Sequence, residues 1–274
     1  ILAACGVPVR VWPRAPKMNF KPFIVFDKNL LSLRIIKKIR KNISVTTLSK
    51  SNLILVLGGD GFMLQTLKKF YKHRKPFYGI NTGTYGFLMN KFSENKFLKN
   101  LNSSKQIIIN PLEMFVQTTN NIIKKSIAIN EISVLRQSKQ ACSLSLKVNK
   151  KKIIKNLISD GILVSTPAGS TAYNFSAHGA ILELDSNKLA VTPINPFRPR
   201  RLGGFVVNKK SSITITNLNS SKRPFSAFAD NFTVRNVKSI RIKNNNKIAF
   251  KILYNRNNSL EKKIKLEKIR KEKK

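Results

Sequence analysis

One short turn in this sequence combines the residue types that phosphate chemistry needs. The apolar run Leu53–Leu57 ends at Gly58-Gly59-Asp60-Gly61. Glycines let the backbone approach a polyphosphate, and the N-terminus of a following helix attracts its negative charge. An aspartate in such a turn repels phosphate unless it accepts a proton or binds a metal. We therefore interpret Asp60 as a residue with a chemical role, and a tight turn capped by the aspartate is the alternative.

A second group of small and hydroxyl-bearing residues surrounds the short apolar run Ile162–Val164. It consists of Ser159-Asp160-Gly161 before that run and Thr166-Pro167-Ala168-Gly169-Ser170-Thr171-Ala172-Tyr173 after it. A turn of this composition can hold a flat ring against Tyr173 while hydroxyls and amides meet the polar edge of the ring. We expect a short helix over 172–177 after this turn, with Ser170-Thr171 as its cap, and the alternative to a ligand site is that the turn serves only to cap that helix.

The third candidate is the pair Asn130-Glu131, beside a β-like run that contains Ile127, Ile129 and Ile132. A carboxylate next to an amide can bracket the two neighbouring hydroxyls of a ribose. The alternative is a polar pair on an exposed strand.

Two different patterns indicate the elements that position these residues. In the first hundred residues, buried-strand candidates alternate with helical spacing, as in Phe23–Phe26, then Leu31, Ile35 and Ile39, then Leu53–Leu57, then Leu64, Leu67 and Tyr71. Alternating β and α units predict a mostly parallel sheet. After about residue 100 the pattern becomes mainly β, as in Leu144, Leu146 and Val148, Ile213 and Ile215, Ser239–Ile242 and Ile248–Leu253.

Length and composition set further bounds. A chain of 274 residues with 42% hydrophobic content can build one or two domains. Its apolar runs are far shorter than the 18 or so residues of a membrane helix. Two cysteines, Cys5 and Cys142, are too few for a disulfide framework; we interpret them as free thiols in a cytoplasmic protein. Residues 1–17 do not have the order of a signal peptide, and we expect a leader there before a start at Met18.

The charge is extreme, because 52 Lys and Arg against 12 Asp and Glu give a formal net charge of +40. That balance raises a nucleic-acid hypothesis. However, the lysines are spread along the chain among Asn, Ile and Phe, and no helix-turn-helix, zinc or RNP-type motif accompanies them. We therefore favour compositional drift and expect nucleic acid to bind only non-specifically. A field of this sign also draws in small polyanions such as nucleotides.

Taken together, these residues resemble the NAD kinase family. The resemblance rests on the Gly58–Gly61 turn, Gly79-Ile80-Asn81 leading to Gly86-Phe87-Leu88, the Asn130-Glu131 pair, and the run from Asp160 to Gly179. It extends from Met18 to about Leu253, and the part from Thr166 to Tyr173 is the most specific. The glycine-aspartate turn alone is shared with lipid kinases and phosphofructokinases.

The resemblance implies a Rossmann-like α/β domain over residues 18–100, a β-rich domain over 101–254, an active site between them, and a basic tail over 255–274. It implies transfer of the γ-phosphoryl group of ATP, or of polyphosphate, to NAD, with Mg²⁺ arriving on the triphosphate, and a homo-oligomer. Asp60 is then the general base, and Gly58, Gly59 and Gly61 face the phosphates. The residues that would contact NAD are Asp60, Gly61, Asn130, Glu131, Asp160, Ala168, Thr171, Ala172, Tyr173, Asn174, Phe175 and Ser176.

Three features depart from the family pattern or extend it. Ala168 stands where many relatives have Thr, and Asp230-Asn231 stands where many have Asp-Gly. The segment 193–201 carries Arg198, Arg200 and Arg201, whose basic side chains can meet phosphates. His178 is left out of the expected site, because a lone histidine at a helix end is more often structural. The rival functions are a lipid or sugar kinase with the same turn and a basic nucleic-acid-binding protein.

Overall fold

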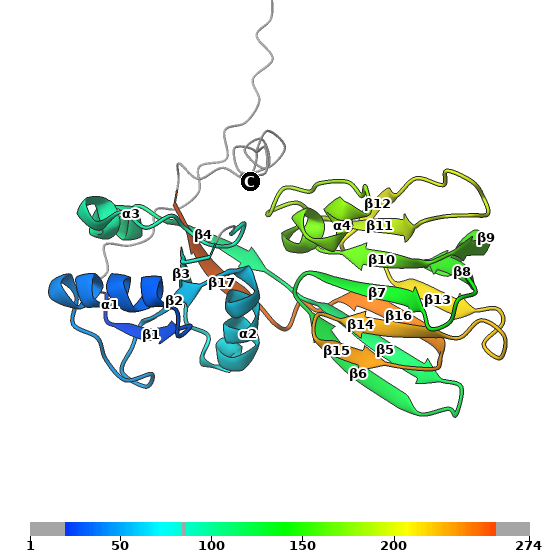
Figure 1. Cartoon of the computed structure of the whole chain (residues 1–274), viewed down its shortest axis with the longest axis horizontal. Helices are drawn as coiled ribbons and strands as arrows, with labels where there is room; N and C mark the ends of the chain where they lie inside the picture. The colour runs from blue at the N-terminus through cyan, green and yellow to red at the C-terminus, as the bar shows by residue number, and fades with distance from the viewer. Residues whose placement is uncertain (1–19, 84–85, 256–274) are drawn as a thin grey trace, which may run out of the picture. The chain divides into compact units, whose positions relative to one another are not determined.

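The computed structural model describes residues 20–83 and 86–255 (Figure 1). These form two compact units: one holds the residues up to Ile107 and those from Lys251 on, and the other holds Ile108–Phe250. The division falls later than the expected boundary at residue 100, and the end of the chain returns to the first unit. The expected leader over 1–17 lies outside the described residues, as does the tail beyond Asn255.

The first unit is built on a five-stranded sheet with the order β1-β2-β3-β17-β4. Its strands are β1 (Pro22–Phe26), β2 (Leu53–Gly58), β3 (Phe77–Asn81), β4 (Lys105–Ile109) and β17 (Phe250–Tyr254). β1 pairs in parallel with β2, β2 with β3, and β3 with β17, so the expected parallel sheet is confirmed. Figure 1 shows β17, drawn in orange-red, beside the cyan β3. Residues 251–254 thus belong to the α/β sheet, not to the β-rich domain in which the sequence pattern placed them.

Helices of the first unit form where the apolar spacing predicts them, although Leu31 is exposed and Leu64 is only half-buried. α1 (Leu30–Asn42) buries Ile35, Ile36 and Ile39, and the Asn29 side chain caps its N-terminus. α2 (Asp60–Phe70) begins directly after β2 and buries Met63, Thr66 and Leu67. The remaining helical elements are η1 (Tyr71–His73), η2 (Glu94–Lys96) and α3 (Phe97–Asn102). Tyr71, expected within a helix, therefore lies in a 3₁₀ turn just past the end of α2.

β1 differs from the buried strand that its apolar run predicts. It is the edge strand of its sheet, its centre is only half-buried, and Phe26 at its end is exposed. β2, in the interior of the sheet, is buried along its whole length. An apolar run reveals that a strand faces a core, but it does not reveal whether the strand lies at an edge.

The second unit consists of two six-stranded sheets. One has the order β12-β11-β10-β7-β14-β15 and the other the order β6-β5-β16-β13-β8-β9, with antiparallel pairs. The strands are β5 (Leu112–Thr118), β6 (Ile123–Ala128), β7 (Glu131–Arg136), β8 (Cys142–Val148), β9 (Lys151–Ser159), β10 (Gly161–Ser165), β11 (Lys188–Ile194), β12 (Phe205–Asn208), β13 (Ile213–Asn217), β14 (Phe225–Ala229), β15 (Phe232–Val234) and β16 (Val237–Asn244).

Side chains from both sheets of this unit form one buried core, in which Leu146 and Ile215 of one sheet join Ile162 and Val164 of the other. Cys142 is a buried free thiol in the same core, as expected of a small apolar residue. Burial raises the pKa of that thiol to about 12. No helix among the described residues is long and apolar enough to cross a bilayer.

The segment after β10 folds differently from the expected capped helix. It forms a 3₁₀ turn, η3 (Ala168–Thr171), and then a four-residue helix, α4 (Tyr173–Ser176). The N-cap is Ala172, and no side chain caps the helix. The Ser170 hydroxyl instead donates to the carbonyl of Pro167 and accepts the Leu182 N–H, because the loop after α4 folds back over it.

Candidate functional site

The glycine-aspartate turn lies at the carboxyl end of β2, where an open α/β sheet binds ligands. Gly59 is the N-cap of α2, with an extended backbone, and its carbonyl accepts the Met63 N–H at 3.0 Å. A Cβ atom at Gly59 or Gly61 would meet nothing within 4 Å. These two positions therefore leave the backbone accessible at a helix N-terminus, as a phosphate contact requires.

Asp60 joins this turn to the other glycine-containing stretch of the first unit. Its carboxylate accepts the backbone N–H of Phe87 at 2.7 Å and that of Leu88 at 3.0 Å. The hydroxyl of Tyr254, from β17, donates to the Phe87 carbonyl at 2.8 Å. Burial and the nearby Asp60 charge raise the pKa of Tyr254, so its hydroxyl stays protonated. The half-buried Asp60 carboxylate is thus held in one orientation, which a general base and a structural turn both require.

Asn130 and Glu131 occupy the turn that leads into β7 in the second unit. The Asp230 carboxylate, from the β14–β15 turn, accepts the Ile129 N–H at 2.9 Å and the Asn130 N–H at 3.3 Å. Asn130 Oδ1 and Glu131 Oε2 are buried, and among the described residues neither has a hydrogen-bond partner. Because an unpaired buried acceptor is costly, these two atoms point to a ligand that supplies donors.

Glu131 is an unusual carboxyl group. Burial, and to a lesser extent the charge of Asp230, raises its pKa from 4.5 to about 7. Near neutral pH the group exists in both forms, and its protonated form can donate a hydrogen bond as well as accept one. Such a group suits a hydroxyl that can serve as donor or acceptor.

The Thr166–Gly169 turn packs directly on Asn130. The Thr166 N–H donates to the Asn130 carbonyl at 2.9 Å, and the Thr166 hydroxyl donates to the Ile129 carbonyl at 2.7 Å. A Cβ atom at Gly169 would lie 2.2 Å from the Asn130 carbonyl oxygen. The structure therefore brings together two of the predicted motifs, and only glycine fits where they touch.

Asp160 is paired within the protein. Its carboxylate accepts Arg136 Nε at 2.6 Å and Asn195 Nδ2 at 3.0 Å. The group is partly exposed, at 35% of its side chain, so a ligand can still reach it. Sequence reasoning identified Asp160 but not its two partners, which come from β7 and the end of β11.

Asn174 requires a correction. It was expected to contact NAD, but its side chain is fully buried. Its Nδ2 donates to the carbonyls of Ser170 at 3.1 Å and Ala180 at 2.9 Å, and its Oδ1 accepts the Thr192 hydroxyl at 2.7 Å. Asn174 therefore fixes the loop around α4 to β11, and its amide is committed to the protein.

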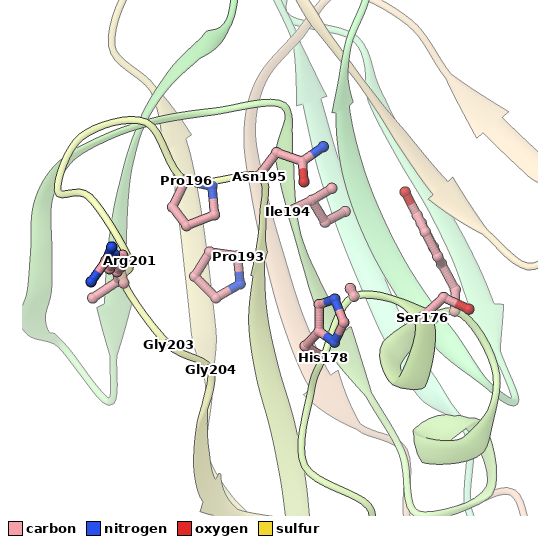
Figure 2. A pocket seen from close by; sticks show the side chains of 12 residues that line it. Ser176, His178, Pro193, Ile194, Asn195, Pro196, Arg201, Gly203 and Gly204 are labelled. Atoms are coloured by element: carbon pink, nitrogen blue, oxygen red, sulfur yellow. The ribbon is translucent and has the colours of Figure 1, made fainter. Parts of the chain in front are cut away.

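The other residues of this segment differ in exposure. Ala168 and Thr171 are buried, Ala172 and Phe175 are half-buried, and Tyr173 and Ser176 are exposed. Tyr173 and Ser176 line an open cavity of about 380 Å³ in the second unit (Figure 2). His178 lines the same cavity, although sequence reasoning left it out. Its φ of 58° is uncommon for histidine, and a helix period cannot reveal that conformation.

Among the described residues, no group of three or more His, Cys, Asp or Glu side chains could hold a metal ion. In the first unit, Asp60 is the carboxylate at the glycine-rich turn, and backbone amides contact both of its oxygens.

The chain thus combines an α/β unit, which has a glycine-rich turn at the start of a helix, with a unit of two packed antiparallel sheets, which has buried unpaired polar atoms at Asn130 and Glu131. The family model of the ATP-NAD kinase N-terminal domain matches residues 27–104, and that of the ATP-NAD kinase C-terminal domain matches residues 129–243. The NAD kinase of Rickettsia rickettsii (strain Sheila Smith) is 40% identical over 241 residues, which cover 88% of this chain and 94% of that protein. The chain belongs to the NAD kinase family.

Solved structures agree on the fold. A yeast NADH kinase complexed with NADH superposes with a TM-score of 0.75 at 18% identity, over 96% of this chain and 95% of that one. An NAD kinase from Archaeoglobus fulgidus in complex with ATP gives a TM-score of 0.71 at 24% identity, over 89% of this chain and 98% of that one. The predicted order of an α/β domain followed by a β-rich domain is confirmed.

Proposed function

We propose that this protein transfers the γ-phosphoryl group of ATP to the 2′-hydroxyl of the adenosine ribose of NAD, giving NADP and ADP. The observation that carries the proposal is the match of both kinase domains on one chain, at 40% identity to a curated NAD kinase. The glycine turn before α2 and the unpaired acceptors at Asn130 and Glu131 support it, because the reaction needs a phosphate contact and a ribose contact.

In this reaction the ribose 2′-oxygen forms a bond to the γ-phosphorus while the bond between that phosphorus and the β–γ bridging oxygen breaks. The hydroxyl proton passes to the Asp60 carboxylate, and ADP leaves with the bridging oxygen. To catalyse phosphoryl transfer, a protein mainly has to place the attacking and the leaving oxygen in line and to neutralise the negative charge of the phosphates. The backbone of the Gly58–Gly61 turn and the N-terminus of α2 serve the second need.

Asp60 has the role of orienting the hydroxyl and accepting its proton. The amides of Phe87 and Leu88 hold its carboxylate in place, and a fixed base does not have to be ordered when the substrate arrives. A loose transition state requires little early proton transfer, so orientation is the larger contribution of Asp60.

NAD contacts are proposed for residues of the second unit. Asn130 and Glu131 meet ribose hydroxyls with their unpaired oxygens, and Tyr173 offers an exposed ring for a base to stack on. Asp160 and Ser176 are accessible polar partners. The remaining proposed contacts, Ala168, Thr171, Ala172 and Phe175, are buried or half-buried, and Asn174 holds their segment to β11 through Thr192.

A divalent cation, Mg²⁺ in this proposal, would neutralise the triphosphate and arrive bound to it. We place the enzyme in the cytoplasm, in keeping with its two cysteines, and we expect a homo-oligomer from the family resemblance.

The test is direct. The purified protein is incubated with NAD, ATP and Mg²⁺, and NADP is measured with an NADP-specific dehydrogenase. Inorganic polyphosphate replaces ATP in a parallel arm, and a panel of diacylglycerol and sugar acceptors tests the rival kinases. Formation of NADP alone supports the proposal, whereas phosphorylation of a lipid or sugar without NADP would refute it.

A further inference from the structure

The open cavity beside Tyr173 has a composition that the expected dinucleotide contacts do not account for. Its lining consists of Tyr173, Ser176, Ala177, His178, Pro193, Ile194, Asn195, Pro196, Arg201, Leu202, Gly203 and Gly204. Only Tyr173 and Ser176 belong to the expected NAD contacts. The others come from the residues just after α4, from the end of β11 (Pro193 and Ile194) and from the loop between β11 and β12; most of them are labelled in Figure 2.

Three residues of this lining hold an uncommon backbone conformation. His178 has a φ of 58°, Asn195 of 46° and Arg201 of 56°, and none is a glycine. Non-glycine residues with positive φ are a small minority in proteins and gather at ligand sites more than elsewhere. Three of the nine such residues in the described part of the chain therefore line this one cavity of about 380 Å³.

The β11–β12 loop that carries Arg201 is anchored. Ile158, in β9, donates its N–H to the Arg198 carbonyl at 2.8 Å and accepts the Phe197 N–H at 2.8 Å. The Asp160 N–H donates to the Ile194 carbonyl at 3.0 Å. These bonds fix the first part of the loop, up to Arg198, and Arg201 follows three residues later.

The loop contains three arginines, but only one of them lines the cavity. The Arg198 guanidinium lies over the Phe197 ring, 5.3 Å from its centroid, and Arg200 is exposed outside the lining. Arg201 is part of the wall, as labelled in Figure 2. Of the three arginines in this loop, Arg201 is therefore the one placed to contact a ligand in the cavity.

The lining favours an anion. It has a guanidinium, an imidazole, an amide and a hydroxyl, and none of its twelve residues is acidic. The nearby Asp160 carboxylate is bonded to Arg136 and to Asn195, which reduces its repulsion of a ligand anion. Guanidinium groups bind phosphate in a fork, and a volume of this order fits a mononucleotide-sized group.

We propose that this cavity is a phosphate subsite, in which Arg201 and His178 contact a phosphate group of a nucleotide whose base or ribose lies against Tyr173. The inference rests on the proposed function for the identity of that nucleotide. Either of two ligands could supply this phosphate group: NAD through its diphosphate or ATP through its triphosphate. Binding experiments with each ligand distinguish the two.

The first experiment replaces Arg201 by Asn and measures binding of NAD and of ATP by calorimetry. Asparagine tolerates the left-handed backbone, so the loop is preserved. Loss of a charge-assisted contact weakens binding of the phosphate source about 10- to 100-fold. The matched control is Arg200→Asn, which removes the same charge from the next position outside the cavity and changes binding less than about 2-fold.

The second experiment replaces His178 by Asn, with His73→Asn as control. His73 is in η1 of the first unit. We expect His178→Asn to weaken binding of the same ligand by about 2- to 10-fold, and His73→Asn to leave it unchanged. Adenosine and nicotinamide riboside, which lack phosphate, are measured beside AMP and nicotinamide mononucleotide.

A loss with NAD alone, or with ATP alone, supports the subsite and identifies its source. Equal affinities of Arg201→Asn and Arg200→Asn for both ligands would overturn it. So would an equal loss with phosphate-free nucleosides, because the two side chains would then support the wall instead of binding an anion. A different result would show that the proposed function is wrong: the wild-type protein would bind NAD and ATP but form no NADP.

Discussion

Gly169 and Asn130 touch so closely that a Cβ atom at Gly169 would lie 2.2 Å from the Asn130 carbonyl oxygen. The same carbonyl accepts the Thr166 N–H at 2.9 Å, while the Asp230 carboxylate holds the Asn130 N–H from another strand turn. Two motifs far apart in sequence are thus one structural piece. A change at their contact disturbs Asn130 and Glu131, the pair proposed to bind ribose, from a position outside that pair.

The first prediction follows from that contact. Gly169→Ala forces the 166–169 turn away from Asn130, and we expect a loss of stability of about 1–3 kcal/mol, typical of overpacking. NAD affinity falls with it, because Asn130 and Glu131 shift. Gly203→Ala is the control for stability alone, since a Cβ there meets nothing within 4 Å. Thermal unfolding and NAD calorimetry measure both effects, and an unchanged melting temperature for Gly169→Ala would show that the contact is not as tight as described.

Glu131 gives a pH dependence of stability. Its pKa is raised in the folded state from 4.5 to about 7, so the folded protein binds more protons than the unfolded one between those values. The contribution of Glu131 to the free energy of unfolding is therefore fully present below about pH 4.5, the unfolded pKa, and is lost as the pH rises through about 7, the folded pKa. Glu131→Gln carries no charge, so it should gain stability relative to wild type between about pH 5 and pH 8, by up to about 3 kcal/mol. Melting temperatures across this range test it; a pH-independent difference would contradict the raised pKa.

Much of the first unit could be predicted from local pattern alone. Apolar spacing at Ile35 and Ile39 gave α1, and the change from an apolar strand to glycine located the start of α2. These features depend on residues a few positions apart, so a sequence displays them directly. Edge position, in contrast, depends on the whole sheet. For this reason β1 was mistaken for a buried strand, and β17 was assigned to the wrong domain.

The sequence indicates candidate site residues by their type, but it does not show which way their side chains point. Asp60, Glu131 and Tyr173 are candidates by their residue type, but nothing local shows that Asn174 faces inward toward Thr192. Likewise, the capping role expected of Ser170 failed because a loop twelve residues later supplies its partner, Leu182. Side-chain direction in such a turn is decided by tertiary contacts, which a single sequence does not list.

Tyr173 and Asn174 are neighbours with opposite expected behaviour. Tyr173→Ala removes an exposed ring, so it should leave stability unchanged and weaken NAD binding by roughly 1–3 kcal/mol, the scale of base stacking, with less effect on ATP. Asn174→Ala leaves the buried Thr192 hydroxyl and two carbonyls without partners, and each costs about 1–3 kcal/mol. We expect its melting temperature to fall clearly. The contrast fails if Tyr173→Ala destabilises the protein as much as Asn174→Ala.

Asp60 allows the sharpest separation of chemistry from structure. Asp60→Asn keeps the size of the side chain but removes the proton acceptor and turns an amide group toward the N–H of Phe87 or Leu88. If Asp60 orients and deprotonates the ribose hydroxyl, turnover falls by roughly 10²–10⁴, while NAD binding by calorimetry changes little.

Tyr254→Phe is the control, because it loosens the same segment by removing the bond to the Phe87 carbonyl and leaves the base intact. Its turnover should stay within a few-fold of wild type. Near-normal turnover of a folded Asp60→Asn variant would exclude the catalytic role. If both variants lose activity only in proportion to their loss of folded protein, Asp60 serves to hold the turn.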